Sequence, residues 1–351
     1  MDTNIGAKER VTQNRLIGLF KNVLKYTYLG NWETREDNAN IEEKLLTAYL
    51  SRRGYTDKEI RSSIVKLKQS ANSLGGGLYN ANKEVYTFLR YGVNIQAEVT
   101  EKKKMVHLID WANPMENDFQ IAEEVTIQGA SDRRPDLVVY VNGIALAVIE
   151  LKRSTVSAHE GIRQNIRNQQ DGYIPRFFTT IQLLFAGNDT EGLHYGVIKT
   201  PEKFWLRWKE PCGEPCQPSH FTAKEYPNEL DRSVLQFFEP VRLLEYIHDF
   251  IIFDGGIKKT ARPNQYFAVK AAQPRVRKKQ NGIIWHSQGS GKSLTMVWLA
   301  QWIRENVSDA RVVIITDRDE LDKQIESGFK DVGEQIQRAK SMQSFFNYFS
   351  F

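Results

Sequence analysis

Three residues able to perform hydrolytic chemistry stand close together in the segment RPDLVVYVNGIALAVIELKR, residues 134–153. Asp136 follows a proline, and Glu150 and Lys152 end an otherwise apolar run. Side chains alternate between the two faces of a strand, so Glu150 and Lys152 share one face. Two carboxylates and a lysine at one strand end can hold a hard cation and position a water molecule. The pattern therefore indicates a hydrolytic site, although a buried Glu150–Lys152 ion pair with a purely structural role is the alternative.

The same segment is expected to form a β-hairpin, and its turn decides whether the two carboxylates meet. Asn142-Gly143 is a strong turn signal because both residues tolerate positive φ. With a strict two-residue turn, Asp136 lies opposite Ile149 and faces away from Glu150. A loop of odd length or one β-bulge would put both carboxylates on one face. A shared metal site therefore predicts one of these irregularities.

Length and composition limit the class of protein. The chain has 351 residues, 41% hydrophobic and 26% charged, which fits a globular protein of two domains. Its net charge of +5 weakly favours an anionic partner. No apolar run approaches the roughly 18 residues of a membrane span and no signal peptide begins the chain, so a cytoplasmic location is expected. Cys212, Cys216 and His220 fit no standard zinc spacing, and a proline-rich loop is favoured there.

Hydrophobic spacing places helices and strands around the hairpin. Helices are expected over 12–26, over about 40–54 with a capping box at Asn40–Glu43, and over 56–68 with a second box at Thr56–Glu59. Strands are expected at 86–90, 94–99, 105–110 and 119–127 before the hairpin and at 182–186 and 195–199 after it, with a helix over 157–170 between. These elements predict an α/β domain over residues 1–210. A linker and helical connection over 211–260, with a helix over 233–253, is expected to follow it.

A second group of functional residues is expected in HSQGSGKS, residues 286–293, which resembles a P-loop although His286 replaces the first glycine of the full pattern. Expected helices at 261–279 and 294–306 and buried strands at 282–285 and 312–316 supply the strand–loop–helix context of that motif and predict a parallel sheet. Glycine N–H groups would wrap a phosphate, the lysine would neutralise its charge, and a serine would bind Mg²⁺. A flexible loop is the alternative for GSGKS, and the context favours nucleotide binding. The expected ATP-binding residues are Gln265, placed to read an adenine edge, Gly289, Ser290, Gly291, Lys292 and Ser293.

The two groups in this order resemble one family. Asp136, Glu150 and Lys152 match the PD-(D/E)xK nuclease signature, and a P-loop follows it as in the restriction (motor) subunit of type I restriction–modification enzymes. Supporting segments are IDWANPMENDF (109–119), NGIALAVIELK (142–152), QYFAV (265–269) and IITDRDELDKQI (314–325). The chain thus resembles the N-terminal portion of that subunit.

The resemblance implies a PD-(D/E)xK restriction-endonuclease-like domain, followed over residues 261–351 by an incomplete RecA-like domain of a superfamily 2 helicase. It implies Mg²⁺-dependent cleavage of duplex DNA coupled to ATP, in complex with methyltransferase and specificity subunits. Asp136, Glu150 and the Leu151 carbonyl would bind Mg²⁺, and Lys152 would orient the attacking water or stabilise the phosphorane charge. The alternatives are a helicase–nuclease of another restriction class, or a DNA-binding fragment without activity.

The sequence departs from the family's Gln-x-x-x-Tyr motif on the helix after the lysine. Gln164 has the expected spacing from Lys152, but Asn168 stands where the tyrosine should be. A shifted match, Gln169 with Tyr173, lies later in the chain, and Gln164 is favoured by position. Glu42 or Glu43 is a candidate for an acidic residue that some nucleases carry on the first helix, and helix capping is the alternative for Glu43.

The motor motifs are expected to be incomplete. Asp317, Asp319 and Glu320 follow an expected strand and suit a DNA-contacting helicase motif better than a Walker B carboxylate. We therefore expect the front portion of a longer motor, which binds nucleotide weakly and does not turn it over.

Overall fold

The computed structural model describes residues 5–96, 103–211 and 220–315. The chain divides into two compact units. The first comprises Met1–Glu210 and Pro218–His248, and the second comprises Pro211–Gln217 and Asp249–Phe351. Within the described ranges, no helix is both long and apolar enough to cross a membrane.

A seven-stranded mixed sheet forms the centre of the first unit, in the order β1-β4-β5-β6-β7-β8-β9. Strands β1 and β4 pair in parallel, as do β6 and β7, and the other neighbours are antiparallel. All eight residues of β6 are buried, as expected of a central strand covered on both faces. The strands are β1 (Thr27–Asn31), β4 (Phe119–Glu123), β5 (Leu137–Val141), β6 (Ile144–Leu151), β7 (Leu183–Asn188), β8 (Gly192–Gly196) and β9 (Leu206–Arg207).

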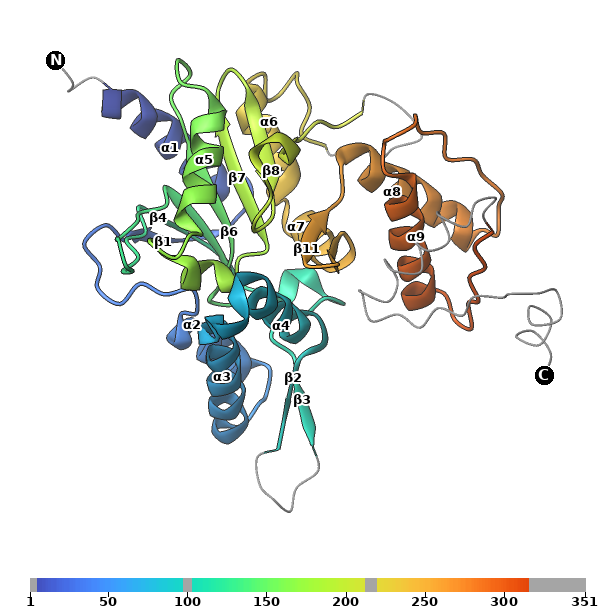
Figure 1. Ribbon diagram of the computed structural model, residues 1–351, viewed down its shortest axis with the longest axis horizontal. Helices are drawn as coiled ribbons and strands as arrows, with labels where there is room; N and C mark the ends of the chain where they lie inside the picture. Colours follow the sequence, from blue (N-terminus) through green and yellow to red (C-terminus); the bar gives the residue numbers. More distant parts are fainter. Residues whose placement is uncertain (1–4, 97–102, 212–219, 316–351) are drawn as a thin grey trace. The chain divides into compact units, whose positions relative to one another are not determined.

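Helices cover both faces of this sheet (Figure 1). On one face, Phe238 of α6 (Glu229–Phe238) lies 4.6 Å from Phe185 of β7 between ring centroids, and Phe20 of α1 (Ile5–Asn22) lies 5.2 Å from Phe238. On the other face, α5 (Ala158–Asn168) packs Ile162 into a core that contains Val148. Helix α7 (Pro240–Asp249) follows α6, and both lie in the stretch expected to connect two domains.

A helical layer lies at the turn end of the β5–β6 hairpin (Figure 1). The Glu42 N–H donates to the Gly143 carbonyl at 2.8 Å, which joins the start of α2 to the turn. The elements of this layer are α2 (Glu43–Arg52), α3 (Asp57–Asn72), α4 (Gly77–Tyr91) and the small hairpin of β2 (Val93–Ile95) and β3 (Lys104–Val106). Short 3-10 turns lie at Leu74–Gly76, Pro114–Glu116, Pro175–Thr179 and Glu202–Phe204.

The second unit begins with a hairpin of β10 (Ile251–Asp254) and β11 (Ile257–Thr260), followed by α8 (Pro263–Arg277) and α9 (Lys292–Asn306). The Phe250 ring lies 4.8 Å from Tyr266 on α8 and 6.1 Å from Trp298 on α9. These rings join the two helices to the residue that precedes the hairpin.

Most of the expected elements are confirmed, with α1, α2, α3, α5, α8 and α9 overlapping the predicted helices and β4 to β8 the predicted strands. The capping box at Thr56–Glu59 is also present, but α2 begins after Glu42 without a side-chain cap. The strand expected at 86–90 is wrong, because that stretch lies in α4, where helical spacing from Leu78 onward buries one face.

Three further expectations are wrong. Residues 251–253 form strand β10 and not helix, since the hairpin with β11 pairs them. Residues 282–285 and 312–315 are not strands, because nothing in the described ranges supplies a neighbouring ladder for them. The Ile283 and Trp285 side chains are about nine-tenths exposed there, at 89% and 90%. Cys212, Cys216 and the motif residues from Thr316 onward lie outside the described residues.

Candidate active site

The β5–β6 hairpin contains the irregularity that a shared acidic site requires. Its turn residues, Asn142 and Gly143, have φ values of 53° and 80°, as in a tight two-residue turn. Further along the ladder the register shifts by one residue, which leaves Leu146 as the extra residue of a β-bulge. The pairs on either side of the shift are Tyr140 with Ala145 and Val139 with Ala147.

The bulge reverses the parity of everything beyond it. Leu137 pairs with Ile149, so Asp136, one residue outside the strand, falls in register with Glu150. Residues in register across a ladder share a face of the sheet. The predicted hairpin irregularity is therefore confirmed as a bulge combined with a regular turn, and Asp136 and Glu150 belong to the same face.

Hydrogen bonds tie two of the three motif residues, Asp136 and Lys152, to the main chain of Leu151. The Leu151 N–H donates to Oδ2 of Asp136 at 2.6 Å. The Lys152 Nζ donates to the Leu151 carbonyl oxygen at 2.8 Å. Glu150 is fully buried, whereas Lys152 is half-buried at the end of the strand. The carboxylate, the lysine and the main chain of Leu151 thus form one compact polar group beside Glu150.

The burial of Glu150 depends on a glycine of α5. A Cβ atom placed at Gly161 would lie 3.3 Å from Cβ of Glu150 and 3.1 Å from Cβ of Ala186. A glycine lets the helix lie this close to β6 and β7 without a shift of these neighbours. A lone glycine in a predicted helix is the sequence signal for this contact.

The two candidate glutamines on α5 differ in their surroundings. Gln164 is half-buried within the helix, whereas Gln169 is the C-cap residue and nine-tenths buried. The Gln169 Nε2 donates to the Asn165 carbonyl at 2.9 Å, and its Oε1 accepts from the Lys199 N–H at 2.7 Å. Both ends of the Gln169 amide therefore bond to the main chain, at Asn165 and at Lys199. Tyr173 lies beyond the end of α5.

Substitutions at these glutamines should separate their roles. We expect Gln169→Ala to lower the free energy of unfolding by about 2 kcal/mol, because two buried hydrogen-bonding groups lose their partner. Gln164→Ala should leave stability within about 0.5 kcal/mol and lower the rate of DNA cleavage. Urea unfolding and cleavage assays on both variants test this. A stable Gln169→Ala variant that has lost cleavage would reverse the assignment.

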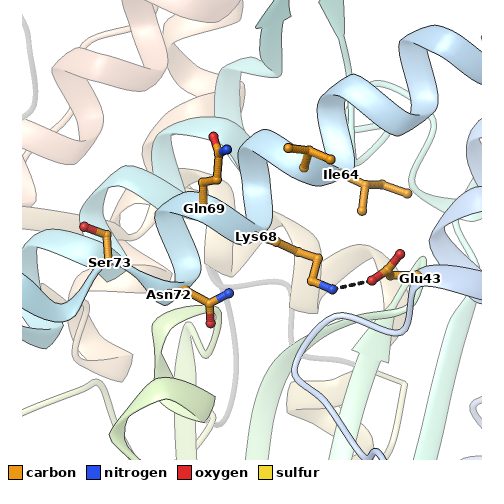
Figure 2. Close-up of a pocket in the computed structure, with 7 residues that line it drawn as sticks. Glu43, Ile64, Lys68, Gln69, Asn72 and Ser73 are labelled. Carbon is orange, nitrogen blue, oxygen red and sulfur yellow. Dashed lines mark hydrogen bonds and ion pairs between the residues drawn. The ribbon is translucent and has the colours of Figure 1, made fainter.

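The acidic residues at the start of α2 do not join the acid pair. Glu42 forms a bidentate ion pair with Arg35, with distances of 3.1 and 2.6 Å, and lies at the turn end of the hairpin. Glu43 pairs with Lys68 of α3 at the edge of a shallow pocket (Figure 2). Glu150 stands at the opposite end of β6, roughly 20 Å away at the rise of a strand. Both glutamates therefore form structural ion pairs at the start of α2.

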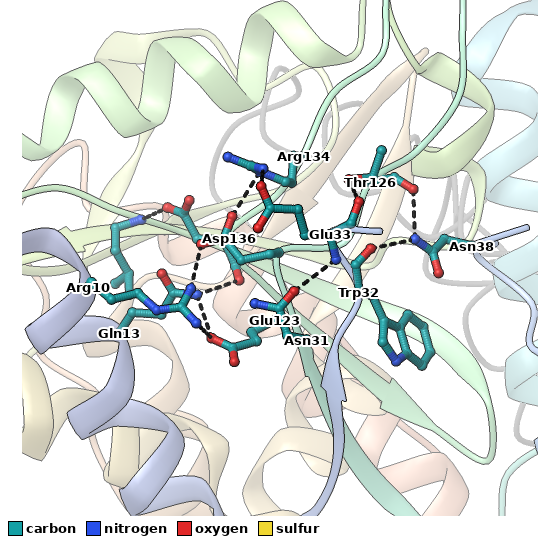
Figure 3. Close-up of polar contacts among 12 residues, drawn as sticks. Arg10, Gln13, Asn31, Trp32, Glu33, Asn38, Glu123, Thr126, Arg134 and Asp136 are labelled. Carbon is teal, nitrogen blue, oxygen red and sulfur yellow. Dashed lines mark hydrogen bonds and ion pairs between the residues drawn. The ribbon is translucent and has the colours of Figure 1, made fainter. Parts of the chain in front are cut away.

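Polar residues that sequence reasoning missed surround the main chain of Asp136 (Figure 3). Gln13 on α1 and Glu123 at the end of β4 are both buried and hydrogen-bonded to each other at 3.0 Å. Gln13 precedes Leu16 and Ile17 by three and four residues, so helical spacing placed it on the apolar face of α1, and this was the available signal. The partners of Gln13 lie more than 100 residues away in sequence, at separations of 110 and 123, so spacing alone could not reveal the contact.

In the second unit, the expected phosphate-binding residues form a loop directly before α9. Gly289 and Gly291 have φ values of 76° and 86°, a region open to glycine, and the helix begins at Lys292. The Lys292 Nζ donates to the carbonyl oxygens of Ser287, at 3.1 Å, and His286, at 3.4 Å. Ser293 lies in the first turn of α9, next to the helix N-terminus.

Gln265 has an unforeseen contact with this loop. Its Nε2 donates to the Gly291 carbonyl at 2.8 Å, and its Oε1 accepts from the Arg262 N–H at 2.7 Å. A Cβ atom at Gly291 would lie 2.3 Å from Nε2 of Gln265. The glutamine therefore supports the loop from α8, and both ends of its amide are engaged by these contacts.

The mixed sheet and its acid pair define a mixed α/β protein with a candidate hydrolytic centre. Comparison with protein families shows to which family this protein belongs. Residues 7–203 match the family described as type I restriction enzyme R protein N terminus. The match covers more than half of the chain, and the chain belongs to this family. Residues 264–349 match the family described as SWI2/SNF2 ATPase.

Individual relatives agree with this assignment. The chain is 26% identical to a putative type I restriction enzyme MjaIXP endonuclease subunit of Methanocaldococcus jannaschii, over 95% of this chain and 35% of the relative. It is 27% identical to the type I restriction enzyme HindI endonuclease subunit of Haemophilus influenzae, over 78% of this chain and 27% of the relative. The chain thus spans about a third or less of the length of these proteins.

Proposed function

We propose that the first unit is the nuclease part of an ATP-driven, DNA-translocating type I restriction subunit, with a PD-(D/E)xK centre that cleaves duplex DNA. The observation that carries the proposal is the bulge in β6, which sets Asp136 in register with Glu150 beside Lys152. Membership of the R protein N-terminal family supports the same reading. Neither observation favours the competing proposal, which is a helicase–nuclease of another restriction class.

The donor set fits a magnesium ion. Asp136 and Glu150 offer carboxylate oxygens from one face of the sheet, and the Leu151 carbonyl follows Glu150 directly in the chain. Hard oxygen donors of this kind are the ligands that Mg²⁺ takes in proteins. The burial of Glu150 under Gly161 of α5 strengthens the attraction of its carboxylate for a cation. We therefore assign Asp136, Glu150 and Leu151 as the metal-binding residues.

Each proposed site residue has its own role in phosphodiester hydrolysis. When bound, Mg²⁺ would polarise the phosphate and lower the pKa of a coordinated water. Lys152, held at the Leu151 carbonyl, would orient the attacking water or stabilise the negative charge that develops on the phosphate. Gln164, half-buried on α5, would contact the reacting phosphate from the helix.

For the second unit we infer that Gln265 and the loop Gly289–Ser293 bind ATP. We assign the motor, its DNA-translocating activity and the methyltransferase and specificity partners to the whole subunit. The loop-to-helix geometry at Lys292 and the SWI2/SNF2 family match support this inference. A cytoplasmic location follows from action on intracellular DNA.

Metal-dependent cleavage separates the nuclease from a DNA-binding fragment without activity. The chain is incubated with circular duplex DNA, with Mg²⁺ or with a chelator. Cleavage that requires Mg²⁺ supports the nuclease, whereas binding without cleavage at any metal concentration favours the inactive fragment. Co-purification with a methyltransferase pair then distinguishes a type I subunit from a stand-alone helicase–nuclease.

Nucleotide binding should depend on the supported loop. We expect Lys292→Ala to weaken binding of ATP at least about tenfold, because the loop loses its phosphate-neutralising charge. Gln265→Ala should weaken it less, since the Gly291 carbonyl loses one hydrogen bond and the loop remains. Titration with a fluorescent ATP analogue measures both effects, and Lys270→Ala on α8 is the control. Equal affinity in all four proteins would exclude this loop as the nucleotide site.

A further inference from the structure

The acid pair depends on how the main chain is held at Asp136, just outside β5. Its carbonyl oxygen accepts two hydrogen bonds, from the Glu124 N–H at 2.9 Å and from Nε2 of Gln13 at 3.4 Å. Its carboxylate accepts from the Leu151 N–H at 2.6 Å. Main chain and side chain of this residue are therefore fixed by different parts of the fold. Gln13 is the contact that comes from a helix.

Gln13 is itself held in place by a buried carboxylate (Figure 3). Its Nε2 also donates to Oε2 of Glu123 at 3.0 Å, and both side chains are almost fully buried. Glu123 accepts a further hydrogen bond from the Tyr28 hydroxyl at 2.5 Å and pairs with Arg10 at 3.2 Å. Burial and the bond to Glu123 raise the pKa of Tyr28 to about 12, so the hydroxyl remains a donor at neutral pH.

Glu124, the residue after Glu123, forms ion pairs with two arginines. Glu124 has a φ of 51°, an uncommon conformation for a residue with a side chain, and its N–H is one of the two donors to Asp136. Its carboxylate pairs with Arg10 at 3.1 Å and with Arg134 at 2.9 Å. Arg10 therefore bridges Glu123 and Glu124, and the turn after β4 is tied to α1 at two consecutive residues.

Glu123, which holds Gln13, lies on the face of the sheet opposite to the Asp136 carboxylate. Glu123 pairs with Leu137 and shares its face, whereas Asp136 belongs to the other face, with Glu150. Gln13 therefore contacts the main chain of Asp136, and neither Gln13 nor Glu123 belongs to the proposed ligand set. Their arrangement has the form of an outer-shell contact, which orients a ligand without binding the ion.

We propose that Gln13 is a positioning residue, which fixes the main chain of Asp136 so that its carboxylate meets Glu150 around the cation. This inference rests on the proposed function, because it assumes that the acid pair binds a metal. Loss of an outer-shell contact typically weakens metal affinity or activity about 10- to 100-fold. The loss should be recoverable at high metal concentration, since all the ligands remain.

The test is calorimetric titration of the whole chain with Mn²⁺, which stands in for Mg²⁺, beside cleavage measured across Mg²⁺ concentrations. We expect Gln13→Met to weaken Mn²⁺ binding about tenfold, and to raise the half-saturating Mg²⁺ concentration about as much, while cleavage at saturating Mg²⁺ stays near the wild-type rate. Thr12→Val is the matched control, because Thr12 is a buried neighbour on α1 whose hydroxyl bonds to Asp189 at 3.2 Å and not to Asp136. It should leave metal affinity unchanged.

Unchanged Mn²⁺ affinity in Gln13→Met, or an equal loss in Thr12→Val, would overturn the inference. If Gln13→Met does not fold, Tyr28→Phe decides, because it removes only the hydroxyl bond to Glu123 and should weaken Mn²⁺ binding about threefold; unchanged affinity there contradicts the positioning role. Failure of the proposed function is distinguishable. In that case wild type binds no Mn²⁺, or Asp136→Ala binds it as tightly as wild type.

Discussion

Replacement of Lys152 by alanine should lower the rate of Mg²⁺-dependent DNA cleavage about a thousandfold, the order expected when a positioned charge-stabilising donor is lost. The Lys152 ammonium is held 2.8 Å from the Leu151 carbonyl, beside the acid pair. The lysine is half-buried at a strand end, so the free energy of unfolding should change by less than about 1 kcal/mol. Single-turnover cleavage and urea unfolding measure the two quantities.

The control for this variant is Lys44→Ala. Lys44 is exposed on α2, at the turn end of the hairpin, so the variant removes the same charge far from the acid pair. It should cleave at the wild-type rate. A Lys152→Ala variant that keeps the wild-type rate would show that the lysine is a structural partner at the end of β6.

The second large effect is expected at Gly161. Leucine at this position should lower the free energy of unfolding by about 3 kcal/mol, because its Cβ already falls 3.1 to 3.3 Å from side-chain atoms of β6 and β7, and these neighbours must shift to admit it. Moving α5 outward also exposes Glu150, so cleavage should fall at least about tenfold. Chemical unfolding and the cleavage rate at low temperature separate the two losses.

Gly18→Leu is the matched control, since Gly18 is also a helical glycine but a Cβ there has its nearest neighbour at 4.0 Å. Helix propensity favours the leucine by up to about 1 kcal/mol. We therefore expect Gly18→Leu to keep or raise stability. Equal destabilisation of the two variants would mean that any helical glycine in this unit resists substitution, and that Gly161 has no special contact with Glu150.

The hairpin shows how far sequence reasoning reaches. The turn at Asn142-Gly143, the all-buried strand and the charges at its end follow from local patterns, and the parity rule required an irregularity in the ladder. Local patterns could not say where the irregularity lies, and the ladder places it at Leu146. The contact of Gln13 with Asp136 was out of reach, because it joins positions 123 residues apart.

In the second unit, local patterns predicted the loop and its helix but failed for the flanking strands. The P-loop string predicted a helix directly after its glycines, and α9 begins there at Lys292, two residues before the expected start, because such a signal is set within a few residues. The flanking strands at 282–285 and 312–315 were expected from apolar composition alone. A strand exists only with a partner for its backbone groups, and the described residues supply none there.

The most direct test of the account is the cleavage of circular duplex DNA by wild type and by Glu150→Gln over a range of Mg²⁺ concentrations. The glutamine keeps the size of a fully buried side chain and removes the charge that the cation requires. The account predicts that wild type cuts the DNA only with Mg²⁺ and that the folded variant does not cut at any concentration. Cleavage by Glu150→Gln at the wild-type rate, or no cleavage by wild type at saturating Mg²⁺, would contradict it.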